Sequence, residues 1–238
     1  MKSSNKLIAL GSLMALAGFL LSGPLAFLFV QLIKPQPAWT SASIFTANYS
    51  PVQNLPYFFG FVLIGGLLIL AAAHYLDAAN NHLTRLRLLL SLSCTLIFSV
   101  LIGFNYICQT SFFVHHLAEH YKPEYDAAIA TFSMANPMSL CWAIEMWGYA
   151  VLGIATWLMA AYYRGKNNAI RILLTANGLV SVGSVVFMVV DNQWLMTSTG
   201  LVAYGVWNIL MIVLLGLIYR HAKQQQKRVS SQNKIYEA

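Results

Sequence analysis

The stretch Leu140–Tyr163 has the sequence LCWAIEMWGYAVLGIATWLMAAYY and decides the fold of this chain. It is long enough to cross the hydrocarbon core of a bilayer as a helix, which takes about 20 apolar residues. Glu145 is the one charged residue inside it, and it lies between Trp142 and Trp147. A carboxyl group at membrane depth costs roughly 2.5–3.5 kcal/mol on insertion scales, so such a residue usually has a partner or a function.

Five further stretches have the same apolar character, and none of them contains an acidic residue. They are Leu7–Ile33, Tyr57–Leu76, Leu88–Cys108, Ile172–Val190 and Leu201–Tyr219. Because every backbone group in lipid must be satisfied within its own segment, helices are expected. We therefore predict an all-α polytopic membrane protein, a bundle of six transmembrane helices that forms a single domain over residues 1–238.

The composition supports this class and excludes others. The chain is 58% hydrophobic and 9% charged, whereas soluble domains contain about 25% charged residues. Its net charge of +7 does not indicate a nucleic-acid partner, because the basic residues flank the apolar stretches. Lys2 and Lys6 precede the first stretch as in a signal peptide, but the apolar run is far longer than the ~7–15 residues of such a signal. We expect an uncleaved helix, kinked at Pro24.

The basic residues also predict the sidedness of the chain. With both termini in the cytoplasm, only Lys34 and Lys122 of the 14 Lys and Arg residues lie outside, which is a strong positive-inside bias. A bacterial inner (plasma) membrane is expected. On the outer side, Thr110–Tyr121 is predicted to form a short amphipathic helix, either flat on the membrane or capping the bundle. The polar tail from Gln224 to Ala238 is expected to be mobile.

The second and fourth stretches share residue types at a constant offset, which indicates either an internal repeat or a recurrence of small residues by composition. The glycine pairs Gly60/Gly148 and Gly65/Gly153 both match. Small residues let helix backbones approach closely. We expect close helix packing at these glycines, and the flat faces would also suit a homodimer.

Polar residues near the outer ends of the stretches predict a site. Glu145 and Asn208 lie at similar depth, and Asn105, Gln109 and Asp191 lie at the outer ends of their stretches. Intramembrane polar groups face the bundle interior or a water-filled cavity. We predict an outward-facing ligand pocket around these residues, with aromatic walls from Trp142, Trp147 and Trp207. Acidic and aromatic groups suit a small cationic or lipophilic molecule. In the alternative, Glu145 hydrogen-bonds Asn208 or Asn105 and only locks the bundle.

A histidine cluster in the second outer segment predicts a metal site. His116 and His120 are four residues apart, so on a helix both imidazoles could bind one zinc or other transition-metal ion. The five residues His116-x-x-Glu119-His120 resemble the HxxEH signature of inverzincin metalloproteases. That resemblance implies a glutamate base at Glu119. The alternative is a polar helix face that is rich in histidine.

Two of the three cysteines are expected at the same membrane boundary. Cys108 ends the third stretch and Cys141 begins the fourth, whereas Cys94 lies deeper. In an oxidising compartment a Cys108–Cys141 disulfide would clamp the outer segment, provided that the Cα atoms come within ~7 Å.

These observations give three hypotheses about function. The first is a multi-pass membrane protein that binds, and in one variant transports, a small cationic or lipophilic molecule around Glu145. The second is a metal-dependent membrane hydrolase that uses His116, Glu119 and His120. The third is a non-enzymatic accessory or sensor protein. The residues favour a non-enzyme, with the lipid bilayer as its environment and no nucleic-acid partner.

Overall fold

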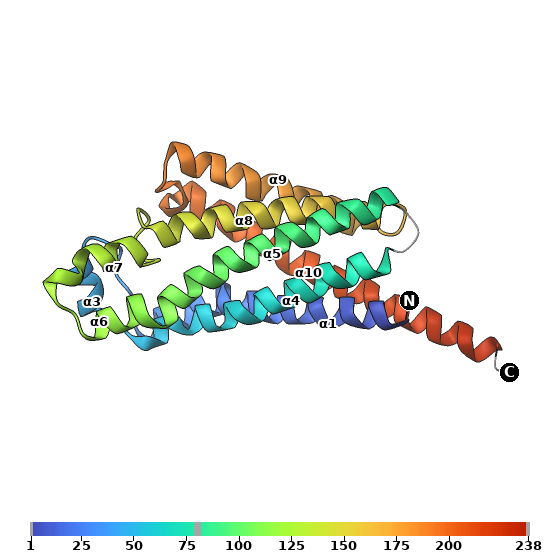
Figure 1. Cartoon of the computed structure of the whole chain (residues 1–238), viewed down its shortest axis with the longest axis horizontal. Helices are drawn as coiled ribbons and strands as arrows, with labels where there is room; N and C mark the ends of the chain where they lie inside the picture. Colours follow the sequence, from blue (N-terminus) through green and yellow to red (C-terminus); the bar gives the residue numbers. More distant parts are fainter. Residues whose placement is uncertain (1, 79–81, 237–238) are drawn as a thin grey trace.

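Six long apolar helices form the body of the protein (Figure 1). The computed structural model describes residues 2–78 and 82–236. The first membrane-crossing unit consists of α1 (Lys2–Ser22) and α2 (Pro24–Ile33). The other five are α4 (Leu55–Asp77), α5 (His82–Thr110), α8 (Leu140–Met159) with the short η4 (Ala160–Tyr163), α9 (Asn168–Val190) and α10 (Ser198–Tyr236). All six predicted membrane helices are confirmed, and the described residues contain no strand.

The six helices pack in a ring that follows their order in the chain. α1 packs on α4, α4 on α5, α5 on α8, α8 on α9 and α9 on α10, and α10 closes the ring against α1. The closest pair is α1 with α4, because Gly11 and Gly18 lie directly against the backbone of α4 at Leu70 and Leu63. A continuous core of Leu, Ile, Phe and Tyr side chains fills the interior.

The other glycines show which close approaches were predicted correctly. Gly60 and Gly148 both pack against α5, at Tyr106 and Ile102 respectively. Gly153 packs against Ser181 of α9. Gly65 was predicted to contact a helix but faces open space, because its neighbour Gly66 makes the contact with α1.

The first membrane helix is interrupted at Gly23, directly before Pro24, as expected for a kink. Pro24 has no N–H group, so the hydrogen-bond ladder loses one bond at this point. On either side the ladder continues, from Gly23 N to Phe19 O and from Phe27 N to Gly23 O, both at 2.9 Å.

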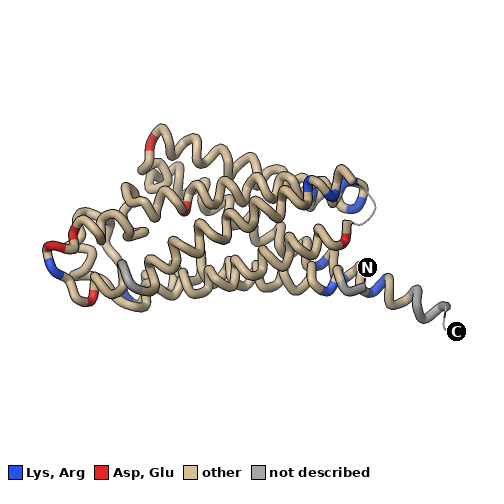
Figure 2. Tube along the Cα trace, in the orientation of Figure 1, with Lys and Arg blue, Asp and Glu red and all other residues tan. Residues whose placement is uncertain are grey.

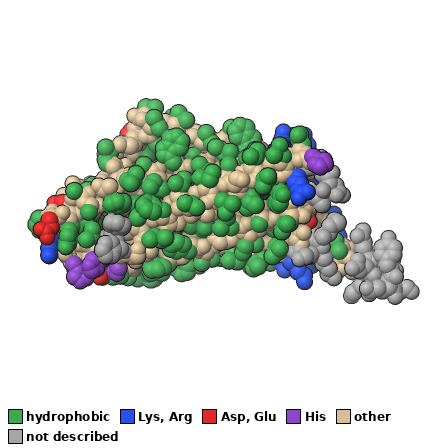
Figure 3. All heavy atoms as spheres, in the orientation of Figure 1, with side chains coloured by type: hydrophobic (Ala, Val, Ile, Leu, Met, Phe, Trp, Pro, Cys, Tyr) green, Lys and Arg blue, Asp and Glu red, His purple; other side chains and the backbone are tan. Residues whose placement is uncertain are grey.

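Charge divides the two ends of the bundle. Both termini lie at one end, and Figure 2 shows Lys and Arg concentrated there, with most Asp and Glu at the opposite end. Hydrophobic side chains cover the flank between the ends (Figure 3). An apolar flank between two polar ends is what a bilayer requires, and the protein is membrane-embedded.

At the end opposite the termini, two segments far apart in the sequence fold together into what we call the cap. It consists of α3 (Ala42–Ala47), the π-helical turn η2 (Phe112–His116), α6 (Leu117–Glu119) and α7 (Asp126–Phe132) (Figure 1). Phe45, Val114, Ala118 and Ile129 are buried in its core. The predicted amphipathic segment Thr110–Tyr121 therefore continues from α5 into the cap. Of the two predicted placements, flat on the membrane or capping the bundle, it takes the second.

The C-terminal segment is more regular than the sequence indicated. A mobile tail from Gln224 was expected, but α10 continues to Tyr236. Residues 222–228 are good helix formers, and the segment up to Tyr236 contains no Gly or Pro that would end the helix. Gln226 Nε2 also donates a hydrogen bond to Asn5 O at 2.8 Å, which joins this extension to the start of α1.

Candidate functional site

The cap-side half of α8 presents two different faces. The helix begins at Leu140, and the Ser139 hydroxyl accepts a hydrogen bond from Trp142 N at 3.0 Å, which is a helix N-cap. Cys141, Glu145 and Gly148 face α5. Trp142, Ala143 and Met146 instead line a groove beside α9. We call these two sides the α5 face and the α9 face.

On the α5 face, Glu145 is buried and fully engaged. Asn105 Nδ2 donates to Glu145 Oε2 at 2.7 Å, and the Tyr106 hydroxyl donates to Glu145 Oε1 at 3.1 Å. Within the described residues Glu145 has no ion-pair partner. Of the two amide partners considered from the sequence, the structure brings Asn105 to the acid.

Gln109 extends this arrangement to the cap. Its Nε2 donates to Asn105 Oδ1 at 3.2 Å and to Phe132 O at 2.7 Å, and its Oε1 accepts from Met134 N at 3.1 Å. Asn105 and Gln109 are buried. A continuous chain of hydrogen bonds therefore runs from the cap to Glu145, and each buried group in it has a partner, as buried polar groups require.

Tyrosines complete the surroundings of Glu145 and were missed by the sequence reasoning. The rings of Tyr57 and Tyr106 lie 5.4 Å apart. Tyr106 also interacts with the hydroxyl of Tyr149. A useful signal was present, because Tyr149 follows Glu145 by one helical turn and so lies on the same face.

The remaining predicted pocket residues lie apart from Glu145. Asn208 Nδ2 donates to Tyr204 O within α10 at 2.8 Å, while its buried Oδ1 has no partner in the described structure. Trp207 Nε1 donates to Asn177 Oδ1 at 2.9 Å, which joins α10 to α9. Asp191 is exposed at the end of α9 and accepts a hydrogen bond from Gln193 N.

A groove of ≈ 150 Å³ opens on the other side of α8. Its walls are Ser139, Trp142, Ala143, Met146 and Trp147 of the α8 region and Val185, Met188 and Val189 of α9. The two helices touch closely at Gly153 and Gly178. Nearer the cap, larger side chains hold the helices apart, and the groove results.

Trp142 is the unusual member of this groove. Only 8% of the side chain is exposed, and its Nε1 is buried without an acceptor in the described part of the protein. A buried N–H group of indole normally finds an acceptor. Trp142 therefore carries an unused hydrogen-bond donor beside a mostly apolar groove, in which Ser139 and Asn192 are the other polar lining residues.

Inside the helical ring a second cavity is much smaller. Its volume is ≈ 20 Å³, and its walls are Leu, Met and Ala side chains with Thr95 and Thr156. This is room for about one water molecule. Both threonine hydroxyls already donate to backbone carbonyls within their own helices, so this cavity offers no binding site for a larger molecule.

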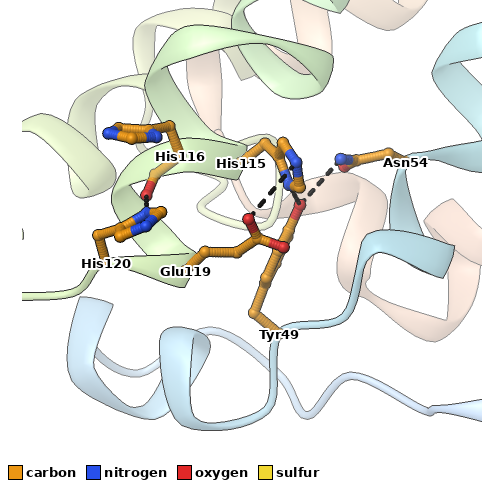
Figure 4. Close-up of polar contacts among 6 residues, drawn as sticks. All are labelled: Tyr49, Asn54, His115, His116, Glu119 and His120. Atoms are coloured by element: carbon orange, nitrogen blue, oxygen red, sulfur yellow. Dashed lines mark hydrogen bonds and ion pairs between the residues drawn. The ribbon is translucent and has the colours of Figure 1, made fainter.

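The three histidines of the cap make two separate sets of contacts (Figure 4). His115 Nε2 lies 3.7 Å from Glu119 Oε2, and His115 Nδ1 lies 2.8 Å from the Tyr49 hydroxyl. The rings of His116 and His120 lie against each other, with centroids 4.4 Å apart and planes tilted by 32°. Glu119 thus contacts His115 and not the predicted ligand pair. Among the described residues no three His, Cys, Asp or Glu side chains converge as a metal site would require.

Tyr49 links the two cap segments. Its hydroxyl accepts a hydrogen bond from Asn54 Nδ2 at 2.8 Å. Burial raises the pKa of Tyr49 to about 12, so the hydroxyl stays protonated at neutral pH. Tyr49, His115 and Asn54 therefore form a hydrogen-bonded clasp between residues near positions 50 and 115.

The predicted cysteine pair also comes together. Cys108 and Cys141 are both buried and are not joined by a disulfide, and their thiols lie beside each other across the α5–α8 contact. Gln109 lies beside Cys141. Cys94 is a separate, half-buried thiol.

A second polar cluster, at the end with the termini, was not found from the sequence. Buried His74 lies 2.7 Å from both Leu70 O, through Nδ1, and the Tyr163 hydroxyl, through Nε2. The neighbouring Tyr162 hydroxyl donates to Asp77 Oδ2 at 2.6 Å. Lys166 Nζ lies 3.5 Å from the Tyr162 ring centroid. These contacts fasten the end of α4 to η4.

The helical ring, its apolar flank and the charge at its ends define a multi-pass α-helical membrane protein. No protein-family model, no curated protein and no solved structure matches the chain. Its function must therefore be inferred from its own side chains.

Proposed function

We propose that this protein binds a small lipophilic molecule carrying a hydrogen-bond acceptor, in the groove between α8 and α9. The observation that carries the proposal is the buried, unpaired Nε1 donor of Trp142, a residue that lines a mostly apolar groove of ≈ 150 Å³. Ligand sites are mostly apolar with a few polar groups that fix orientation. An acceptor on the ligand would satisfy the donor that the protein leaves unpaired.

The geometry favours a lipophilic ligand over a cationic one. Glu145, the acid that suggested a cation, is buried on the α5 face and is already bonded to Asn105 and Tyr106. The groove walls are mainly Trp, Met, Val and Ala side chains, with Pro137, Ser139 and Asn192 and without an acid. A cation there would lose its hydration without gaining a counter-charge, which is costly.

The size of the groove limits what it can enclose. An apolar cavity of about 150 Å³ accommodates a molecule of the size of benzene. A ring or a short length of hydrocarbon would fit, with the remainder of a larger molecule extending into the bilayer. Trp147 and Val189 are more than half exposed at the rim, so we propose that entry is lateral, from the lipid.

Binding is better supported than transport. The interior of the ring is a packed core, and its cavity of ≈ 20 Å³ holds about one water. A molecule in the groove lies outside this ring. We therefore propose a binding protein, a sensor or a carrier within the membrane plane, and not an enzyme.

We further propose that the cap is outside and that both termini are cytoplasmic. The support is the distribution of basic residues, of which only Lys34 and Lys122 lie at the cap end. In a bacterium this membrane would be the inner (plasma) membrane.

Retention of a lipid-soluble molecule during purification tests the proposal. The full-length protein is purified in mild detergent, and bound molecules are extracted and identified by mass spectrometry. Ala143→Trp fills the groove and should abolish retention. Val100→Trp is the matched control, because Val100 is 71% exposed on α5, outside the groove, and it should retain the molecule.

The donor is tested by Trp142→Phe, which keeps an aromatic ring but removes the N–H group. Loss of one such hydrogen bond, worth about 1.4 kcal/mol, weakens binding about tenfold. A wild-type protein that retains no molecule, or equal retention in wild type and Ala143→Trp, would reject the proposal. Copurification of a partner protein in place of a small molecule would favour an accessory role.

A further inference from the structure

Two thiols from different helices meet at the cap end of the bundle. Cys108 lies in the last turn of α5 and Cys141 in the first turn of α8. They are 1% and 0% exposed, and their thiols lie beside each other. The chain between them, residues 109–140, contains η2, α6 and α7 of the cap. A covalent bond at this point would close that whole segment into a loop.

We infer that Cys108 and Cys141 are a redox-active pair, which interconverts between the dithiol described above and a disulfide that joins α5 to α8. The reaction is thiol–disulfide exchange with a small disulfide. One cysteine thiolate attacks a sulfur of the small disulfide, forming a mixed disulfide and releasing one thiol. The second cysteine then attacks the protein sulfur of that intermediate, which forms the Cys108–Cys141 bond and releases the second thiol. The two protons of the cysteines end on the two released thiols, and the small disulfide is the species reduced.

Access to the buried sulfurs requires opening of the cap end of α5. The helix has a bend at Ser111 and then a π-helical turn, Phe112–His116. Such turns interrupt the regular ladder and often occur at functional sites. Opening at this point would expose Cys108 without disturbing the α5–α8 contact at Gly148, two turns further along α8.

Oxidation would change the surroundings of both sulfurs. Cys141 lies beside Gln109, which hydrogen-bonds Asn105 and the backbone at Phe132 and Met134. Formation of the disulfide draws Cys141 toward Cys108 and removes its thiol proton. The pair therefore connects redox state to the hydrogen-bond chain that runs from the cap to Glu145.

A redox titration of the full-length protein in detergent tests this inference. The protein is equilibrated with glutathione and glutathione disulfide at a series of ratios, unreacted thiols are blocked, and non-reduced peptides are mapped by mass spectrometry. Oxidising ratios should give a Cys108–Cys141 linked peptide that disappears at reducing ratios. Cys94 should stay blocked throughout and serves as the internal control.

Thermal stability gives a second readout. The oxidised protein should melt roughly 10 °C higher than the reduced protein, because the disulfide closes a long loop. Cys94→Ser should keep this shift, and Cys141→Ser should abolish it while the protein remains folded. The inference is overturned if both cysteines remain blocked at every ratio, if glutathione adds to one of them without forming the pair, or if the link appears only in unfolded protein. None of these outcomes depends on groove binding, which Ala143→Trp tests separately.

Discussion

The two faces of the cap-side half of α8 differ in polarity and in accessibility. The α5 face carries Cys141 and Glu145, is polar, and is sealed. The α9 face carries Trp142 and Met146, is apolar, and opens into a groove. The polar face and the accessible face therefore lie on opposite sides of one helix, about half a turn apart. In this bundle the polar cluster around Glu145 joins helices internally, whereas the proposed ligand site lies on the mostly apolar α9 face.

The largest effect on stability is expected when the acid is removed from the buried α5 face. Glu145→Ala leaves the donors of Asn105 and Tyr106 buried without acceptors, and we expect a loss of about 3 kcal/mol in unfolding free energy. Thermal unfolding in detergent measures it. Glu145→Gln keeps one carbonyl acceptor and should lose less than half as much. If Glu145→Ala is as stable as wild type but loses a bound ligand, the acid belongs to a binding site and not to a fastening.

A second comparison places the same side chain on each face. Gly148→Leu on the α5 face would drive into Ile102, whose Cδ1 lies 2.6 Å from the position of an added Cβ, and overpacking of this kind costs about 2 kcal/mol. Ala143→Leu on the α9 face meets open groove and should change stability by less than about 0.5 kcal/mol. Thermal unfolding of both variants under one condition is the measurement. Equal destabilisation would show that the α9 face is packed as tightly as the α5 face.

The smallest expected effect concerns the cap that covers the sealed face. Burial raises the pKa of Tyr49 to about 12, above its ordinary value of 10, so folding favours the neutral hydroxyl. Its stabilising contribution is complete below about pH 10 and is lost as the pH rises through 12. The tyrosinate absorbance of wild type minus that of Tyr49→Phe should titrate near pH 12. A midpoint near 10 would mean that the Tyr49 hydroxyl is not buried in the cap.

The architecture was predictable because it depends on local composition. Each apolar stretch is long enough to cross a bilayer, and this property does not depend on contacts with other helices. The pairing of Glu145 with Asn105 was also within reach, since both lie at similar depth near the cap end of neighbouring helices. The extension of α10 was missed because its polar sequence was taken as disordered, although its residues favour a helix.

The groove and the cap could not be predicted, because both depend on contacts between distant residues. The groove exists because α8 and α9 touch at Gly153 and Gly178 and diverge toward the cap. The clasp joins Tyr49 to His115 across most of two helices. Helical periodicity did contain one unused signal. Cys141, Glu145 and Gly148 are spaced as one face of a helix, and Trp142 and Met146 as another.

The order of helices around the ring also shapes how the protein assembles. Each membrane helix packs against the next one in the chain, so most contacts can form as the helices are added one at a time. The exception is the contact between α1 and α10, which joins the first segment synthesised to the last. Until α10 arrives, the lateral edges of α1 and α9 stay uncovered. In a nascent chain these two helix edges therefore stay exposed to lipid until synthesis is almost finished. Truncations that remove α10 should leave the same edges exposed and make the protein susceptible to membrane proteases.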